Sequence, residues 1–325
     1  MSYYLGLDIG GSYLQLGLVT ETGDLLAVRN RASAGGFTGD ELTVAINEMI
    51  IDIKAEYRLV NTDILALGAG VPGHVDNKSG YILHTNNLSF NMYPLRQRLN
   101  DLSQIPVYLA NDATLATLAE SRLGAGQGYS DLVMITIGTG IGGGIVLGGK
   151  IYTGYNQGAS ELGHHVIMLN GELCSCGRRG CFEAYASATA LIRMTKRAAE
   201  KNPDSYLAEL ITKQNGIISG KTAFLAQGQG DVVAATVIDE YLDNVAEGCA
   251  NIINILMPEL MILGGGISQE GEDFLQEVAR RSIELAYLPA GQVPPRFALA
   301  SLGNEAGVIG AALFAAECRA DKIYG

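Results

Sequence analysis

The chain has 325 residues, of which 48 % are hydrophobic, and its 22 Lys and Arg against 34 Asp and Glu give a formal net charge of −12 at pH 7. The hydrophobic share excludes a globally disordered chain, and the negative charge argues against non-specific DNA or RNA binding because it repels phosphate backbones. The length is typical of about two domains.

Glycine is unusually common, with 42 residues against an average near 7 %. The glycines cluster at 68–73, 138–149 and 264–266, which indicates backbone placed where side chains cannot fit. The uncharged stretch 132–149 contains seven of them. Each glycine inside a helix costs about 1 kcal/mol relative to alanine, so two strands around a turn are favoured over a membrane helix. The N-terminus has no basic region before an apolar run, and no signal peptide is expected.

The first half of the chain predicts strands and helices in alternation. Apolar residues alternate through 4–19 around a glycine turn, which is typical of a strand hairpin, and they recur at helical spacing in 40–58. The remaining elements expected here are strands at 25–31, 64–70 and 107–109 and a helix at 113–123.

The second half restarts with a similar opening. Residues 132–137 and 144–147 are expected to be strands on either side of a glycine turn, and the two similar openings suggest an internal duplication. Further strands are expected at 261–263 and 294–301, and helices at 182–200, 205–214, 221–228, 231–255, 270–286 and 305–319. This order predicts an α/β fold with mixed sheets.

Two glycine-rich turns have the composition of phosphate-binding loops. The first, Asp8-Ile9-Gly10-Gly11-Ser12, has a carboxylate at a strand end, glycines whose backbone N–H groups can approach an anion, and a hydroxyl. The second, residues 136–144, contains Thr136, Gly138, Thr139 and Gly140. Two such loops facing each other would hold a triphosphate from both sides, and a plain hairpin turn is the alternative for each. The second is not a Walker A loop, because no Gly-Lys-Ser/Thr follows.

Asn111 and Asp112 lie between an expected strand end and an expected helix start. An aspartate at such a junction can simply be the N-cap of the helix. The functional alternative is a general base that takes the proton of a hydroxyl. The residue pattern leaves both interpretations open.

Three of the five cysteines crowd within eight residues, which is not the pattern of a disulfide framework and indicates a cytoplasmic protein with a metal site. His164 lies ten residues before Cys174, and Cys176 and Cys181 follow. One imidazole and three thiolates predict a closed structural zinc site.

Two carboxylates flank this predicted zinc site. Glu161 lies three residues before His164, and Glu183 lies two residues after Cys181. A closed zinc site has no open position for catalysis, so the ion is expected to shape a polar pocket by fixing Glu161 and Glu183.

The segment Cys174-Ser-Cys176-Gly-Arg-Arg-Gly-Cys181-Phe-Glu183, preceded by Glu161-x-Gly-His164, resembles the signature of the ROK family of sugar kinases and sugar-responsive repressors. Asp8-x-Gly-Gly-Ser12, Asn111-Asp112 and Gly264-Gly265-Gly266 match other segments of this family in order. The resemblance implies a two-lobed, actin-like (ribonuclease H-like) ATPase fold with ATP in the cleft. Its smaller lobe would be residues 1–113 plus 305–325, and its larger lobe residues 114–304 with the zinc loop.

The resemblance also implies the roles of individual residues. ATP and Mg²⁺ would be bound by Asp8, Gly10, Gly11, Ser12, Thr136, Gly138, Thr139, Gly140, Gly265 and Gly266. A hexose would be bound by Asn87, Asn111, Asp112, Glu161, His164 and Glu183. The family often has a Trp shortly after the position of Asn87, and Phe90 stands only approximately in its place here, because the chain has no Trp.

The activity implied by the resemblance is ATP-dependent phosphorylation of a hexose, with glucose first, at its primary 6-hydroxyl and with Asp112 as the base. N-acetylglucosamine, N-acetylmannosamine, mannose, fructose and allose stay open as substrates. The alternative is a sugar-sensing regulator of the same family without catalysis. The DNA-binding domain of such repressors is not expected, because the phosphate motif begins at residue 8. A cytoplasmic homodimer or homotetramer is expected, with no nucleic-acid or membrane partner.

Overall fold

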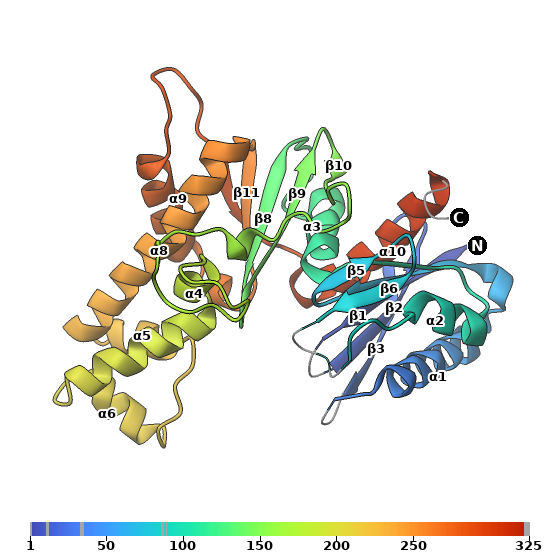
Figure 1. Cartoon of the computed structure of the whole chain (residues 1–325), viewed down its shortest axis with the longest axis horizontal. Helices are drawn as coiled ribbons and strands as arrows, with labels where there is room; N and C mark the ends of the chain where they lie inside the picture. Colours follow the sequence, from blue (N-terminus) through green and yellow to red (C-terminus); the bar gives the residue numbers. More distant parts are fainter. Residues whose placement is uncertain (1, 11–12, 33–35, 86–87, 89, 322–325) are drawn as a thin grey trace. The chain divides into compact units, whose positions relative to one another are not determined.

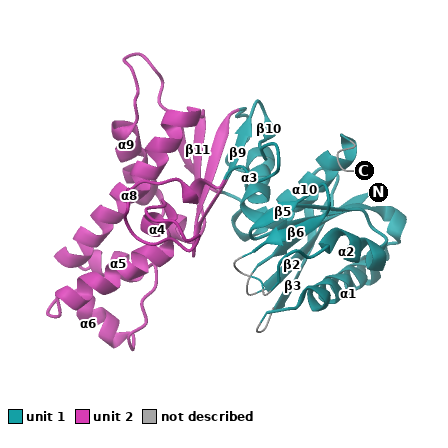
Figure 2. Ribbon diagram, in the orientation of Figure 1, with its two compact units in different colours: residues 1–130, 144–160, 301–325 teal, residues 131–143, 161–300 magenta. Residues whose placement is uncertain are grey.

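The computed structural model describes residues 2–10, 13–32, 36–85, 88 and 90–321. The chain divides into two compact units (Figure 2), unit 1 with residues 1–130, 144–160 and 301–325, and unit 2 with residues 131–143 and 161–300. This division assigns residues 114–130, 144–160 and 301–304 to unit 1, whereas the lobe boundaries expected from the sequence assign them to the larger lobe. Those functional lobes stay a prediction.

Unit 1 is built on a five-stranded sheet in the order β3-β2-β1-β4-β7 (Figure 1). The first three strands are antiparallel, and β1, β4 and β7 are parallel to one another. The strands are β1 (Tyr3–Ile9), β2 (Tyr13–Thr20), β3 (Leu25–Ala32), β4 (Ile64–Val71) and β7 (Val107–Asn111). A small hairpin of β5 (His74–Asp76) and β6 (Tyr81–His84) accompanies this sheet.

Helices cover both faces of this sheet (Figure 1). Successive side chains along each strand point to opposite faces, so each strand contributes to two cores. Leu5, Leu7 and Ile9 of β1 share a core with α1 (Gly39–Tyr57) and α2 (Leu95–Ser103). Tyr4 belongs to the core on the opposite face, with α3 (Asp112–Leu123) and α10 (Ala306–Ala320). The position of Asp8, two residues after Gly6, therefore faces α10.

Glycines permit the close packing of α10. A Cβ added at Gly6 would overlap the carbonyl oxygen of Val308, and one added at Gly68 would overlap that of Ala311. Between the two helices, Gly310 is in the same way pressed against the carbonyl oxygen of Leu115 on α3. Part of the high glycine content therefore lies in strands and a helix rather than in ligand loops.

The second sheet has the strand order β10-β9-β8-β11-β12, in which β8, β11 and β12 are parallel. Its strands are β8 (Leu132–Ile137), β9 (Ile141–Leu147), β10 (Lys150–Ile151), β11 (Leu260–Gly264) and β12 (Arg296–Leu299). In unit 2, α5, α7 and α9 pack against the long α8. The helices are α4 (Glu183–Ala186), α5 (Ala188–Lys201), α6 (Tyr206–Lys213), α7 (Thr222–Gln227), α8 (Val232–Leu256) and α9 (Glu272–Leu285). The α/β class with mixed sheets is confirmed.

One expected helix is wrong, because residues 182–200 form two helices that meet at Ser187. Ser187 is extended, and its side chain accepts a hydrogen bond from the Ala190 N–H, which makes it the N-cap of α5. The expected strand at 294–301 is also shorter, at Arg296–Leu299. Among the described residues, no helix is both long and apolar enough to cross a bilayer.

Candidate active site

Asp8 lies near the carboxyl end of β1, opposite the first turn of α10. A Cβ placed on Gly307, the second residue of the helix, would lie 2.8 Å from Asp8 Oδ2, so a side chain there would force the carboxylate to move. Burial raises the pKa of Asp8 above its ordinary value. The partial positive charge at the N-terminus of α10 offers some compensation to the half-buried carboxylate. Gly307 was not expected at this site, since nothing in the local sequence marks it as a neighbour of residue 8.

The first glycine turn is only partly described. The Gly10 N–H donates to the carbonyl oxygen of Tyr13 over 2.9 Å, which closes the turn between β1 and β2. Gly11 and Ser12 lie outside the described residues, as does Asn87, so their expected phosphate and sugar contacts stay predictions. Phe90, near Asn87, packs against Tyr93 with 5.2 Å between ring centroids.

Asn111 is the N-cap of α3. Its Oδ1 accepts from the Thr114 N–H over 3.1 Å, and its Nδ2 donates to the carbonyl oxygen of Gly73 over 3.3 Å. Asp112 is the first helical residue, and its Oδ1 accepts from the Ala113 N–H over 2.9 Å. The interpretation of Asp112 as the N-cap is therefore wrong, and capping does not account for a carboxylate at this position.

Asp8 and Asp112 belong to the same edge of the unit 1 sheet. In register, Asp8 pairs with Gly70 of β4, and Gly70 pairs with Ala110 of β7. Neighbouring strands are about 4.8 Å apart, so the backbones of Asp8 and Ala110 are roughly 10 Å apart. The carboxyl ends of parallel strands are where α/β sheets bind ligands, and both carboxylates lie there.

The second glycine loop, at residues 138–140, is a tight turn in which the Gly138 N–H donates to the carbonyl oxygen of Gly140 over 2.9 Å. The start of α5 holds its carbonyl groups. The Ala188 N–H donates to the Gly138 oxygen over 2.9 Å, and the Thr189 hydroxyl donates to the Thr139 oxygen over 2.7 Å. Thr136, on β8, is half-buried just before this loop.

Gly265 and Gly266 follow β11. Gly265 has φ +87°, and a Cβ there would lie against the backbone of Ile137 at the base of the 138–140 loop. An added Cβ at Gly266 would meet no atom within 4 Å. The expected contact of this turn with adenosine stays a prediction.

The four expected zinc ligands converge. The donor atoms of His164, Cys174, Cys176 and Cys181 all lie within 4.8 Å of one another. Cys174 Sγ is 3.6 Å from His164 Nδ1, and Cys176 Sγ is 3.7 Å from Cys181 Sγ. Ligands about 2.0–2.3 Å from a tetrahedral zinc ion are roughly 3.5–3.8 Å apart, so the donor set fits zinc.

Two thiols of the cluster resist ionisation when no metal is bound. Burial, together with hydrogen bonding to Cys176 and Cys174, raises the pKa of Cys181 to about 12, and burial raises that of Cys174 as well. Thiols this hard to ionise become thiolates when they ligate a metal. The fold of the loop requires glycine at position 180. The backbone there has φ +84°, and an added Cβ would overlap the carbonyl oxygen of Met168.

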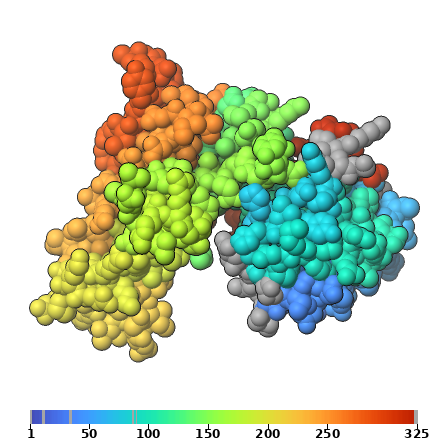
Figure 3. All heavy atoms as spheres, viewed as in Figure 1, coloured from blue at the N-terminus to red at the C-terminus, as the bar shows by residue number. Residues whose placement is uncertain are grey.

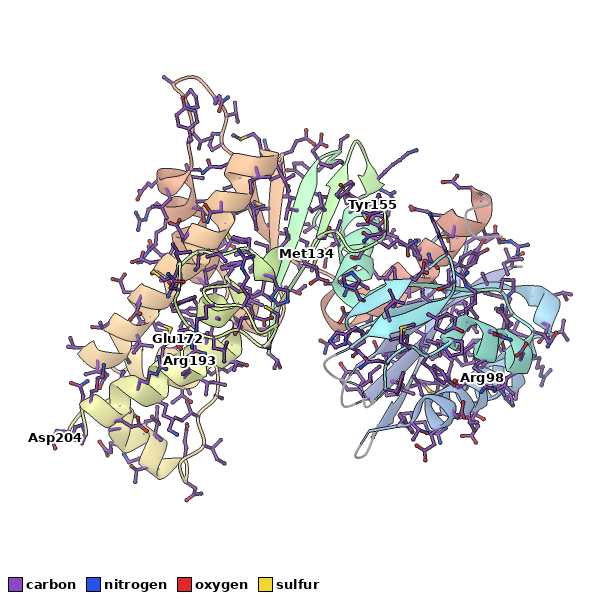
Figure 4. All side chains as sticks on the ribbon, in the orientation of Figure 1. Arg98, Met134, Tyr155, Glu172, Arg193 and Asp204 are labelled. Atoms are coloured by element: carbon purple, nitrogen blue, oxygen red, sulfur yellow. The ribbon has the colours of Figure 1, made fainter. Side chains whose placement is uncertain are left out.

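The zinc loop, residues 165–182, is anchored to α5 and lies on the face of unit 2 seen in Figure 3. Figure 4 shows Glu172 of the loop and Arg193 of α5 pointing toward one another, with 3.9 Å between Oε2 and Nε. Arg197 also pairs with Glu172 and lowers the pKa of that carboxyl group. The Glu172 N–H donates to the Tyr185 hydroxyl over 2.6 Å.

The expected sugar residues of unit 2 surround this cluster. His164 has its Nδ1 toward Cys174 and its Nε2 4.0 Å from Glu161 Oε2. Glu183 Oε1 accepts from the Ser175 hydroxyl over 2.9 Å. The expected site residues therefore form two sets, with Asp8, Gly10, Asn111 and Asp112 on unit 1 and the remaining described ones on unit 2.

Comparisons with known proteins agree with these features. The ROK family model matches residues 4–318. A glucokinase of Halalkalibacterium halodurans is 33 % identical over 313 residues, covering 95 % of this chain and 93 % of that protein. A ROK family glucokinase of Streptomyces griseus, solved with glucose and AMPPNP, superposes with a TM-score of 0.80 at 33 % identity, covering 97 % of this chain and 100 % of that one.

Regulators are also among the relatives. A putative xylose repressor of a Caldicellulosiruptor species is 30 % identical over 287 residues, covering 87 % of this chain and 71 % of the repressor. The family match extends over nearly the whole chain, and it includes the cysteine segment, both glycine turns and the Asn111-Asp112 pair. The chain belongs to the ROK family.

Proposed function

We propose that this protein transfers the γ-phosphoryl group of ATP to the primary 6-hydroxyl of a hexose, with glucose as the first candidate. The end-to-end similarity of the chain to glucokinases supports an ATP-dependent kinase of the hexokinase or glucokinase type. One observation carries the proposal that the chain catalyses this transfer with Asp112 as the base. Asp112 lies at the carboxyl edge of the unit 1 sheet, at a helix start that Asn111 already caps.

The proposed chemistry is an in-line displacement. Asp112 accepts the proton of the sugar hydroxyl as that oxygen attacks the γ-phosphorus, the bond to the β,γ-bridging oxygen breaks, and ADP leaves. Backbone N–H groups of the two glycine turns offset the negative charge on the transferring group. Mg²⁺, when bound with ATP, neutralises further charge on the phosphates.

For the nucleotide, we assign Asp8, Gly10, Gly11 and Ser12 to the phosphates and the metal. Residues 136–140 form the second phosphate loop through Thr136, Gly138, Thr139 and Gly140. Gly265 and Gly266 contact the adenosine. Support comes from the tight turn at 138–140 and from the open space beside Gly266.

For the sugar, we assign Asn87, Asn111, Glu161, His164 and Glu183 to the hydroxyl groups. His164 supports this assignment through its geometry, since Nδ1 faces the cysteines while Nε2 faces Glu161. Zinc, when bound by His164, Cys174, Cys176 and Cys181, has a structural role and holds the two glutamates in place.

A panel of sugars with ATP tests the proposal by following ADP in a coupled assay. We expect glucose to give the highest kcat/KM, with mannose, fructose, allose, N-acetylglucosamine and N-acetylmannosamine as competitors. If another sugar is preferred, the kinase stands and the glucose assignment fails. If sugars bind but none yields ADP above the sugar-free rate, the protein is a sugar-sensing regulator instead. A cytoplasmic location and a homodimeric or homotetrameric state complete the proposal, and size-exclusion chromatography with light scattering tests the latter.

A further inference from the structure

Glu183 contacts two segments that are far apart in the sequence. Its Oε2 accepts a hydrogen bond of 2.9 Å from the Ile141 N–H, at the exit of the 138–140 loop. Its Oε1 accepts one of 2.9 Å from the Ser175 hydroxyl in the zinc loop. The carboxylate therefore bridges the zinc loop and the second glycine loop within unit 2.

The packing of the loop is adapted to this carboxylate. A Cβ placed on Gly140 would overlap Glu183 Oε2, so a side chain at position 140 would displace the glutamate. The absence of a side chain at position 140 thus leaves room for the Glu183 carboxylate in its present place. The same atom, Oε2, packs on Gly140 and accepts from the next N–H in the chain.

The backbone that carries Glu183 is held firmly. Cys181 and Phe182, which precede it, are completely buried, and the Phe182 N–H donates to the carbonyl oxygen of His165 over 2.8 Å. Ala188, just after α4, in turn donates to Gly138. Residues 181–189 therefore connect the metal cluster to the glycine loop, with hydrogen bonds to His165 near one end and to Gly138 near the other.

We propose that Glu183 is a positioning residue for the nucleotide loop, in addition to its assigned contact with the sugar, and that it links the two binding sites energetically. The part of this inference that involves sugar binding rests on the proposed function. A sugar hydroxyl that binds Glu183 restrains the carboxylate, and the restrained carboxylate keeps the 138–141 backbone in its binding geometry. Because binding couplings are reciprocal, the nucleotide must then tighten sugar binding by the same factor.

The decisive measurement is the affinity for Mg²⁺·AMPPNP without any sugar, by isothermal titration calorimetry. Glu183→Ala removes the acceptor of the Ile141 N–H, and we expect the Kd to rise at least fivefold. Glu183→Gln keeps an amide oxygen for that N–H, and we expect its Kd to stay within twofold of the wild type. A residue that only contacts sugar would leave both values unchanged.

Glu161→Ala is the matched control, because Glu161 is the other carboxylate assigned to the sugar and lies against His164. It should weaken glucose binding while its sugar-free Kd for the nucleotide stays within twofold of the wild type. If Glu183→Ala loses its zinc or unfolds, Glu183→Asp replaces it. Aspartate keeps the charge but is one methylene too short to reach the Ile141 N–H, and the same fivefold loss is expected.

A second measurement tests the link. Saturating glucose should lower the Kd of the wild-type protein for AMPPNP at least fivefold, in the usual range of allosteric couplings of about 5- to 150-fold. The inference is overturned if Glu183→Ala and Glu183→Asp bind the nucleotide within twofold of the wild type without sugar, or if glucose leaves the wild-type Kd unchanged. Hexose phosphorylation with these negative results would reject the link but not the kinase. A fivefold sugar-free loss without any hexose phosphorylation would retain the positioning role and reject the proposed function.

Discussion

At the scale of single residues, neighbouring positions divide structural and chemical tasks. Asn111 caps α3 and holds the carbonyl group of Gly73, which leaves the carboxylate of Asp112 without a capping task. Asp8 is half-buried against the first turn of α10, where a side chain at position 307 would press on its carboxylate. Neither carboxylate serves as a helix N-cap, although Asp112 lies in the first turn of α3, where a negative charge is favourable.

Asp112→Asn should abolish most of the transfer while the fold is retained, because asparagine has the same shape but cannot accept the hydroxyl proton. We expect kcat to fall by about 10²- to 10⁴-fold, the usual contribution of a general base. Steady-state kinetics with glucose and ATP measure this, and Asp101→Asn, at an exposed position of α2, is the control. Turnover near that of the wild type would exclude Asp112 as the base.

Asp8→Asn should raise the Tm of the ligand-free protein at pH 7. Burial raises the pKa of Asp8 above its ordinary value of 3.8, so the folded state binds the proton more tightly than the unfolded state does. The charged carboxylate therefore lowers stability above the folded-state pKa, and this cost disappears as the pH falls below about 3.8. Thermal melts from pH 7 downward should show the advantage of asparagine shrinking.

Asp24 provides the opposite control for this pH series. It is exposed, and hydrogen bonds from Thr22 and Thr20 lower its pKa. Asp24→Asn should therefore not raise the Tm at pH 7. A stabilisation by Asp24→Asn equal to that by Asp8→Asn would show that net charge, rather than burial, is responsible.

At the scale of elements, the zinc loop and the start of α5 act together on the second glycine loop. The zinc loop has little regular structure. Its conformation depends on Gly180, on the cluster of four ligands and on the ion pairs of Glu172 with Arg193 and Arg197. The break at Ser187 separates α4 from α5 and turns the Ala188 N–H toward Gly138. A continuous helix would have used that N–H internally.

Cys181→Ser should lower the zinc content of the purified protein from about one equivalent to less than about half. Serine is a poor ligand for zinc, and the three remaining donors no longer close a tetrahedral site. Elemental analysis measures the metal, and a thermal melt should show a lower Tm. Cys249→Ala, a buried cysteine of α8 outside the cluster, should keep its zinc. Full zinc occupancy in Cys181→Ser would contradict the assigned ligand set.

At the scale of the whole molecule, the chain passes between the two units after residues 130, 143, 160 and 300. The buried carboxylate of Glu120 lies where the chain re-enters unit 1 after residue 300. Glu120 of α3 accepts hydrogen bonds from the backbone N–H groups of Ser301 and Leu302, from the Ser301 hydroxyl and from the Ala125 N–H. The carboxylate thus fixes the segment that leads into α10.

Glu120→Gln should destabilise the protein by about 1–3 kcal/mol, because the amide group offers one acceptor oxygen and leaves buried N–H groups unsatisfied. Urea unfolding followed by circular dichroism measures the change. Glu317→Gln is the control, since its pair with Arg122 is half-exposed and such pairs contribute about 0–1 kcal/mol. A change below that of the control would show that the bonds of Glu120 are dispensable.

Long amphipathic elements were predictable from the sequence. The helices expected at 40–58 and 231–255 correspond to Gly39–Tyr57 and Val232–Leu256, since their apolar spacing is a local property. Helix α2 and the β5–β6 hairpin were missed, because they are short and their pairing depends on tertiary contacts such as that of Ile82 with Tyr93. The expected glycine roles were also incomplete, since Gly6, Gly68 and Gly310 serve helix packing.

The sequence by itself determined the fold class, the family and the four side chains that converge as a possible metal site, because these depend on residue types at fixed spacing along the chain. The tertiary structure alone decided which residues surround each carboxylate. Gly307 meets Asp8, and Ile141 meets Glu183, across long stretches of sequence. Such contacts arise when packed elements bring distant backbones together, and no local pattern records them.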